Sequence, residues 1–174
     1  MRIHLDRIGD EPFRWRETRQ LEAASLERPE VVGLGEIAWH GTITQTGTGH
    51  LFQGQLHYEQ TLTCQRCLVE SSTPVSADVE LLLVPDGEEP VEGEVELEDD
   101  ELNVLFVPEG LLDTEPILVE QVHLNVPMRA LCQESCAGLC PECGVDRNRE
   151  TCGCEDSAID PRWSALRDLS SREE

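Results

Sequence analysis

The stretch from residue 132 to residue 143 reads Cys-Gln-Glu-Ser-Cys-Ala-Gly-Leu-Cys-Pro-Glu-Cys and indicates metal chemistry. Cys152-x-Cys154 follows it, and Cys64-x2-Cys67 lies far upstream. A two-residue gap lets the backbone turn so that two thiolates face one ion, and tetrahedral zinc binds four sulfurs at about 2.3 Å. The pattern therefore predicts one or two structural zinc ions. The predicted ligands are all eight cysteines: Cys64, Cys67, Cys132, Cys136, Cys140, Cys143, Cys152 and Cys154.

Two partitions of these cysteines are consistent with the spacing. The stretch 140–144, Cys-Pro-Glu-Cys-Gly, has the composition of a zinc knuckle, because proline stiffens the turn and glycine accepts a positive φ. In the first partition it forms a site with Cys152 and Cys154, and the remaining four cysteines join the upstream pair to the C-terminal region. In the rival partition Cys136, Cys140 and Cys143 share a site with either Cys152 or Cys154.

Disulfides and an iron–sulfur cluster are the alternatives to zinc. Residues 1–7 contain no apolar run typical of a signal peptide. No segment approaches the roughly 18–20 apolar residues that a membrane-spanning helix needs. We therefore expect a cytoplasmic chain without a membrane association, in which clustered cysteines stay reduced and bind zinc. An iron–sulfur cluster uses similar ligands and stays an open alternative.

The charge of the chain limits its partners and its chemistry. There are 36 acidic and 13 basic residues, for a net charge of −23, and every basic residue is arginine. The absence of lysine excludes a P-loop and any Schiff-base mechanism. A strongly acidic surface repels phosphate backbones and favours a basic protein partner, although it also serves solubility alone.

Alternation of apolar and polar residues predicts strands over most of the first half of the chain. The pattern is present in 37–43 and 51–63 and is clearest in 75–83. An antiparallel meander fits these segments, with the Cys64-x2-Cys67 knuckle at a hairpin tip. A short strand is expected in 102–107.

The predicted fold class is α+β, mostly antiparallel β with one or two helices and a C-terminal cysteine-rich zinc module. Residues 1–127 are expected to form a β-rich domain with an acidic loop at 86–101 and a helix at 114–126, which has Pro116 in its first turn. Residues 128–174 are expected to form the zinc-knuckle module, with a terminal helix, opening at Asp160, packed on it.

Several of these motifs together resemble the YceD-like family, named for accumulation of the large-subunit ribosomal RNA in bacteria and plastids. They are Leu131-Cys132-x3-Cys136-x-Gly138-Leu139-Cys140-Pro141-x-Cys143-Gly144, Asn148, Cys152-x-Cys154, Asp160-Pro161-Arg162 with Leu166 and Leu169, the upstream Cys64-x2-Cys67, and Asn125-Val126-Pro127. Residues 145–148, Val-Asp-Arg-Asn, depart from the Asn-Leu-Asn-like run that is more usual in the family.

The resemblance implies a non-enzymatic ribosome-biogenesis factor that supports accumulation or maturation of large-subunit (23S) ribosomal RNA. Its partner would be that RNA or its assembly intermediates, reached directly or through a basic ribosomal protein, with no small-molecule substrate. No catalytic residues are predicted, because the five histidines are scattered without the spacing of an open catalytic zinc site. The alternative function is a zinc-stabilised redox- or metal-responsive protein-interaction adaptor.

Five arginines near the cysteines are candidate contacts to RNA or to a partner: Arg66, Arg129, Arg147, Arg149 and Arg162. A knob ordered by zinc can present such side chains to phosphates. The alternative is that these arginines offset the negative charge of the thiolate sites.

Overall fold

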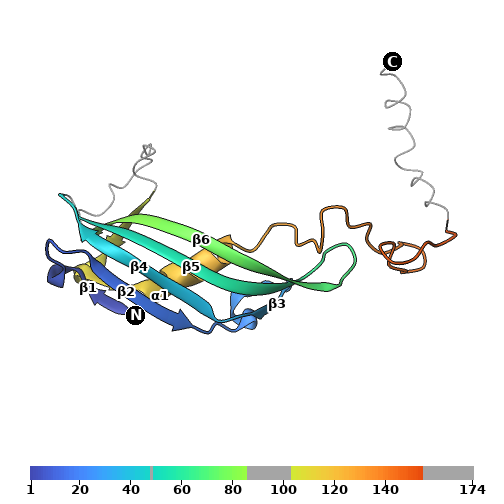
Figure 1. Cartoon of the computed structure of the whole chain (residues 1–174), viewed down its shortest axis with the longest axis horizontal. Helices are drawn as coiled ribbons and strands as arrows, with labels where there is room; N and C mark the ends of the chain where they lie inside the picture. Colours follow the sequence, from blue (N-terminus) through green and yellow to red (C-terminus); the bar gives the residue numbers. More distant parts are fainter. Residues whose placement is uncertain (48, 86–102, 155–174) are drawn as a thin grey trace, which may run out of the picture.

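A curved antiparallel sheet forms most of the molecule in the computed structural model, which describes residues 1–47, 49–85 and 103–154 (Figure 1). The strands follow the order β2-β4-β5-β6-β7, and β3 pairs with β5. Their bounds are β2 Phe13–Arg19, β3 Val31–Leu34, β4 Ile37–Gln45, β5 His50–Thr63, β6 Glu70–Pro85 and β7 Val104–Val107. A separate two-stranded sheet pairs β1 (Arg2–His4) with β8 (Leu111–Asp113).

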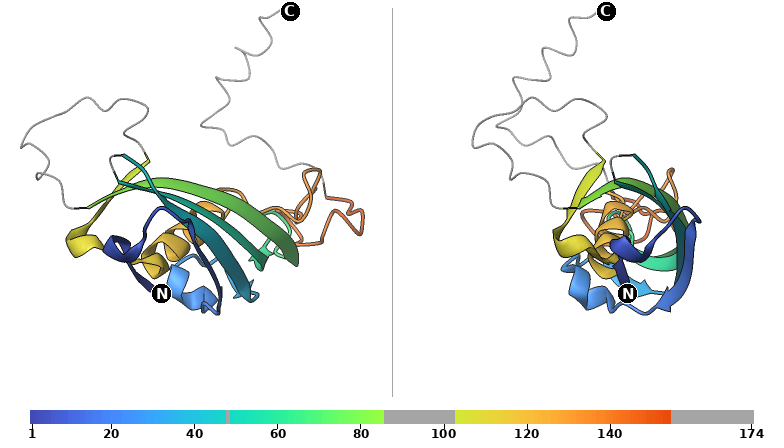
Figure 2. Two further views of the ribbon diagram at one scale, coloured as in Figure 1. Left: turned by 60° about the vertical axis from the view of Figure 1, so that its left-hand side comes forward. Right: turned by 90° about the vertical axis from the view of Figure 1, so that its left-hand side faces the viewer.

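The single α-helix among the described residues, α1 (Thr114–Leu124), lies along the concave side of the sheet, which curls around it (Figure 2). Short 3-10 helices, η1 (Leu5–Arg7), η2 (Ala23–Leu26) and η4 (Pro108–Gly110), complete the described elements. No helix within residues 1–47, 49–85 and 103–154 has the length and apolar character needed to cross a membrane.

The core lies between the sheet and α1, because alternate residues of each strand point inward. Along β5 every second side chain is buried, as the period-2 pattern of the sequence predicts. Trp39 is fully buried and its ring lies over Gly54, where an added Cβ would come within 2.6 Å of the indole. Glycine at this position therefore lets the tryptophan pack closely against β5, where it also contacts the buried rings of Trp15 and Phe52.

The start of α1 is capped as its sequence suggests. The Asp113 carboxylate accepts a hydrogen bond from the Glu115 backbone N–H at 3.1 Å, and this bond, together with the nearby Arg2 side chain and N-terminal amine, lowers the pKa of Asp113. Ile117, Leu118 and Val122 form the buried face of the helix. The cap thus fixes the residue at which the helix begins.

The predicted fold class is confirmed: the described part is mostly antiparallel strands with one helix and a C-terminal cysteine cluster. One predicted boundary was wrong: the helix ends at Leu124 rather than at residue 126, with Asn125 as its C-cap. The short strand expected in 102–107 is β7, which begins at Val104 and runs parallel to β6, so the antiparallel meander ends at β6.

A parallel neighbour requires a connection of a dozen or more residues, and residues 86–102 supply it. The predicted acidic loop at 86–101 and the predicted terminal helix from Asp160 lie outside the described residues. The division into domains at residue 127 stays a prediction.

Candidate metal centres

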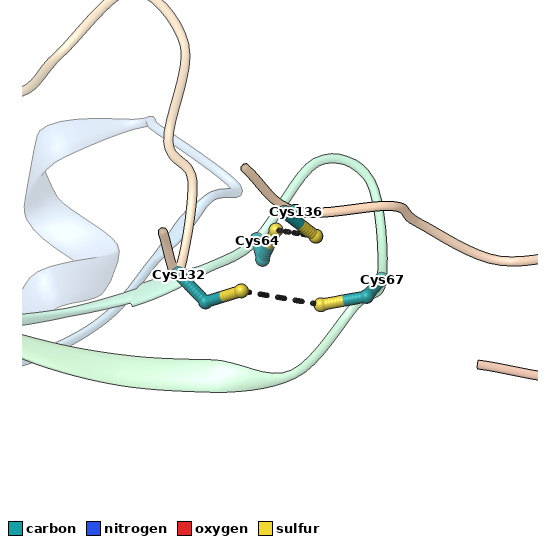
Figure 3. A group of neighbouring side chains, drawn as sticks. All are labelled: Cys64, Cys67, Cys132 and Cys136. Atoms are coloured by element: carbon teal, nitrogen blue, oxygen red, sulfur yellow. Dashed lines mark hydrogen bonds between the residues drawn. The ribbon is translucent and has the colours of Figure 1, made fainter. Parts of the chain in front are cut away.

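Two groups of four cysteines bring their sulfurs together at the end of the long β5–β6 hairpin. The first, here called the hairpin site, consists of Cys64, Cys67, Cys132 and Cys136 (Figure 3). The second, here called the terminal site, consists of Cys140, Cys143, Cys152 and Cys154. This is the grouping of the first partition, and the rival partition, with Cys136 beside Cys140 and Cys143, is not the one that the structure forms.

The spacing of the sulfurs fits a single tetrahedral ion in each site. Within each group all four sulfurs lie within 4.8 Å of one another. Tetrahedral bonds of about 2.3 Å to zinc place neighbouring sulfurs about 3.8 Å apart. In the hairpin site, Cys64 Sγ and Cys136 Sγ are 3.8 Å apart and Cys67 Sγ and Cys132 Sγ are 3.6 Å apart. A disulfide bond is only about 2.05 Å long, so these cysteines are free thiols set at metal-binding distance.

The hairpin site joins parts of the chain that are far apart in sequence. Cys64 and Cys67 lie in the turn between β5 and β6, as predicted. Cys132 and Cys136 come from the segment that follows α1 (Figure 3). Backbone hydrogen bonds from Gln65 N–H to the Ala130 carbonyl (2.9 Å) and from Leu139 N–H to the Arg66 carbonyl (3.0 Å) hold this segment against the hairpin tip.

Gly138 allows this close approach. Its φ is +73°, and a Cβ there would lie 3.1 Å from the Arg66 carbonyl oxygen. Any other residue would be strained in its backbone and crowded against the knuckle. The glycine between the second and third cysteines of the 132–143 stretch therefore has a docking role that spacing alone does not reveal.

The two Cys-x2-Cys knuckles have the same backbone geometry. In the first, Leu68 N–H donates to the Cys64 carbonyl at 2.9 Å and Cys64 N–H donates to the Val69 carbonyl at 2.9 Å. In the second, Gly144 N–H donates to the Cys140 carbonyl at 2.9 Å and Cys140 N–H donates to the Val145 carbonyl at 2.8 Å.

The residue after the second cysteine has a positive φ in both knuckles, 60° at Leu68 and 75° at Gly144. The expectation of a positive φ at Gly144 is confirmed. Its amide bonds to the Cys140 carbonyl. The amide thus closes the turn that places the two sulfurs side by side.

Asn148 links the two sites. It belongs to the terminal loop, yet its Nδ2 donates to Cys136 Sγ of the hairpin site at 3.4 Å and to Asp146 Oδ1 at 2.7 Å. Its Oδ1 accepts a hydrogen bond from Ala137 N–H at 2.7 Å. Side-chain donors to ligating sulfurs orient them and stabilise their charge. Sequence reasoning noted Asn148 only as a family motif and did not predict this contact.

Backbone donors make one thiol in each site acidic. Burial opposes ionisation of Cys64, but the backbone N–H groups of Cys67, Cys132 and Arg66 stabilise its thiolate and lower its pKa to about 6. In the terminal site the backbone N–H groups of Cys143 and Glu142 lower the pKa of Cys140 to about 6. A thiolate is the form that binds a metal, so each site holds a preformed first ligand at neutral pH.

A second thiol in each site has the opposite shift. The hydrogen bond with Cys67, together with burial, raises the pKa of Cys132 to about 12. The hydrogen bond with Cys143, together with burial, raises the pKa of Cys154 to about 12. Negative charge already present on neighbouring sulfurs disfavours further ionisation, and a cation among the sulfurs would remove that penalty.

Two of the five candidate arginines are held against the sites themselves. Arg66 Nη1 donates to the Cys136 carbonyl at 2.7 Å, and Arg147 Nη2 donates to Cys140 Sγ at 3.7 Å. Arg149 pairs with Asp146 at 3.5 Å. Arg129 is exposed, and Arg162 lies outside the described residues. The contact of Arg147 with a cysteine sulfur fits the charge-offsetting alternative, and contact of the five with RNA stays a prediction.

Taken together, the fold and the sites define a class: a curved β-sheet protein with two four-cysteine clusters that could each hold a metal ion, one of which joins the segment after α1 to the tip of a long hairpin. The chain belongs to the family described as large ribosomal RNA subunit accumulation protein YceD, whose model matches residues 52–170. The matched region contains all eight cysteines, and the predicted resemblance is confirmed.

Relatives come from several distant organisms. An uncharacterized protein of Mycobacterium tuberculosis is 30% identical over 175 residues, covering 95% of this chain and 79% of that protein. An uncharacterized protein of Bacillus subtilis is 22% identical over 171 residues, covering 98% and 95%. A chloroplastic large ribosomal RNA subunit accumulation protein YCED homolog of Arabidopsis thaliana is 29% identical over 133 residues, covering 63% and 40%. No solved structure matches the chain significantly.

Proposed function

We propose that this protein is a non-enzymatic ribosome-biogenesis factor that supports accumulation or maturation of 23S ribosomal RNA in the cytoplasm. The observation that carries the proposal is the family match over residues 52–170, since the family is described by accumulation of the large ribosomal RNA subunit. The protein would act on the RNA or its assembly intermediates, directly or through a basic ribosomal protein.

The geometry of the metal centres supports a structural role. Four sulfurs around one ion leave no position open for water or substrate, whereas catalytic zinc keeps such a position. We propose that each site holds zinc: Cys64, Cys67, Cys132 and Cys136 would bind one ion, and Cys140, Cys143, Cys152 and Cys154 the other. The ions would supply no reaction step. They would fix residues 130–154 on the hairpin tip as a rigid recognition surface.

Depletion of the protein in cells tests the biological role. We expect the ratio of 23S to 16S ribosomal RNA to fall, with fewer mature large subunits in sedimentation profiles. Rescue should require the wild-type chain and fail with Cys136→Ser, while the exposed neighbouring variant Ser135→Ala should rescue as a matched control. An unchanged RNA ratio under several growth conditions would contradict the proposal.

The exposure of the terminal site supports a second candidate, a zinc-stabilised redox- or metal-responsive adaptor. Cys143 is exposed and Cys152 half-buried, so an oxidant reaches them more easily than the buried thiols of the hairpin site. Oxidation would release the ion and loosen residues 140–154. Mild peroxide treatment followed by partner pull-down separates the candidates: a changed partner set in a chain that stays folded would favour the adaptor.

A further inference from the structure

The two ends of the main sheet differ in chemistry. The edge strand β2 carries Arg14, Arg16 and Arg19, and charged side chains of this kind discourage pairing with another chain. The opposite edge strand, β7, reads Val-Leu-Phe-Val and contains no charge. Phe106 in its middle is 54% exposed. No strand in the described part of the chain pairs with the outer side of β7, so this edge is open to an added strand.

A groove of about 410 Å³ lies beside this edge, between β7 and α1. Figure 2 shows β7, in yellow, at the sheet margin above the helix. The groove walls come from β7, β8 and α1 and are mainly apolar, and they include Leu105, Phe106, Leu111, Pro116, Ile117 and Glu120. An open edge next to an apolar groove is the arrangement that binds extended peptides: the backbone pairs with the strand and an alternate side chain enters the groove.

The rim of this groove is acidic. Glu120 lines both this groove and an adjoining depression over α1, which also includes Glu115. Among the described residues neither glutamate has an ion-pair partner. A ligand for this surface therefore needs positive charge as well as an apolar side chain.

We propose that β7 and the β7–α1 groove bind an extended, basic segment of a partner protein, which pairs with the outer edge of β7 and places an apolar side chain beside Phe106. The proposal rests on the proposed function in its choice of partner. Proteins that assemble with ribosomal RNA carry basic segments that bind phosphates, and such a segment has the charge that this groove requires. The groove thus gives an acidic assembly factor a way to engage such a protein before the protein meets RNA.

A labelled synthetic peptide, Lys-Val-Lys-Phe-Lys-Val-Lys, tests the surface by fluorescence anisotropy with the full chain. We expect binding that weakens with salt, and at least tenfold weaker binding to Phe106→Ser and to Glu120→Arg. Val32→Ser is the matched control, because Val32 is a similarly exposed apolar residue (44%) on β3, away from the groove. The charge-matched peptide Lys-Ser-Lys-Ser-Lys-Ser-Lys should bind at least tenfold more weakly than the first.

The proposal would be overturned if neither peptide bound, if both peptides bound equally, or if Phe106→Ser and Val32→Ser lost peptide binding to the same extent. A concentration-dependent dimer that Phe106→Ser abolishes would also overturn it, because the groove would then bind a second copy of the chain. Binding seen only in a Trp163→Ala variant would assign it to the chain's own C-terminal segment and contradict the proposal as well. Because these measurements use purified protein, their failure is distinct from an unchanged RNA ratio in depleted cells.

Discussion

The hairpin site and the terminal site have the same ligands and the same knuckle turn but different surroundings. In the hairpin site Cys64, Cys67 and Cys136 are buried. The sulfurs of Cys64 and Cys136 lie side by side although the two residues are 72 positions apart in the sequence. In the terminal site only Cys140 is buried, and all four ligands lie within 140–154. With an ion bound, the same four-cysteine arrangement would therefore act in two ways: as a long-range cross-link that attaches a segment to the sheet, and as a local staple that orders one loop.

Removing one cysteine from each site should have the largest effect and should distinguish the two sites most clearly. Structural zinc contributes on the order of 10 kcal/mol to small folds. Cys136→Ser should release residues 130–154 from the hairpin tip, because the cross-link to β5–β6 is lost. Cys143→Ser should loosen only residues 140–154. Hydrogen exchange by mass spectrometry measures both effects.

The control for this pair is the exchange of β4 and the buried part of α1, which should change little in either variant. If Cys143→Ser exposed 130–139 as much as Cys136→Ser did, the two sites would form one cooperative unit, and the distinction between a cross-link and a staple would be lost.

Asn148 provides a second test, since it is the side chain that joins the sites. Asn148→Asp removes the donor to Cys136 Sγ and places a negative charge beside thiolates. Loss of such outer contacts costs roughly 10- to 100-fold in metal affinity. We expect a loss of that size at the hairpin site, although Asn148 belongs to the terminal loop, measured by competition with a chromophoric chelator.

Glu150→Asp, an equally exposed change two residues away, is the matched control and should leave both affinities unchanged. A loss confined to the terminal site would show that the contact with Cys136 does not govern its ligation.

Acidification should affect metal binding at both sites in the same way, because each site contains one thiol with a lowered pKa. The pKa of Cys64 and of Cys140 is lowered to about 6, so both thiolates are present in the metal-free fold at pH 7. Their stabilising contribution is present above the ordinary thiol pKa and is lost as pH falls through about 6. Each bound ion should therefore displace one more proton below pH 6 than above it.

Proton release on zinc addition, measured by calorimetry in buffers of different ionisation enthalpy, checks this step. A proton count per ion that stays constant between pH 7 and pH 5 would show that the backbone N–H groups do not make these two thiols acidic.

The smallest expected effect concerns the residue after the second cysteine, which is leucine in one knuckle and glycine in the other. Leu68 holds a positive φ that costs a non-glycine residue about 1–2 kcal/mol, while glycine loses about 0.5–1 kcal/mol more chain entropy on folding. Leu68→Gly should therefore stabilise the hairpin site slightly, by up to about 1 kcal/mol. Gly144→Ala should destabilise the terminal site by about 1 kcal/mol, since no atom lies within 4 Å of the added Cβ and only the backbone is strained.

Denaturant unfolding of the zinc-loaded chain measures both changes. Destabilisation by Leu68→Gly would indicate that the leucine side chain, although 63% exposed, packs in a way that outweighs its backbone strain.

The sequence was sufficient to predict the β-rich fold and the metal-site pattern of the cysteines because both depend on local signals, but it left two cysteine partitions open, of which the structure forms the first. Alternation along 75–83 reports strand burial directly, and the Cys-x2-Cys spacing reports a turn. The equivalence of the two knuckles also had a local signal, since Val69 and Val145 stand at the same distance from their cysteines, and that signal was overlooked.

Features that depend on tertiary contacts were beyond sequence reasoning. The parallel pairing of β7 depends on where the chain returns after residue 102, which no periodicity encodes. The contact between Asn148 and Cys136 depends on how the terminal loop folds back. Likewise, Arg66 and Arg147 looked available for RNA in the sequence because their acceptors, a carbonyl oxygen and a sulfur, become neighbours only in the fold.

Native mass spectrometry of the full chain, purified without added metal, tests the central claim most directly. The account predicts two zinc ions per chain and all eight thiols reduced, with one ion remaining in Cys136→Ser and one in Cys143→Ser. A chain that carries no metal, or one whose mass shows pairs of cysteines joined as disulfides, would contradict it.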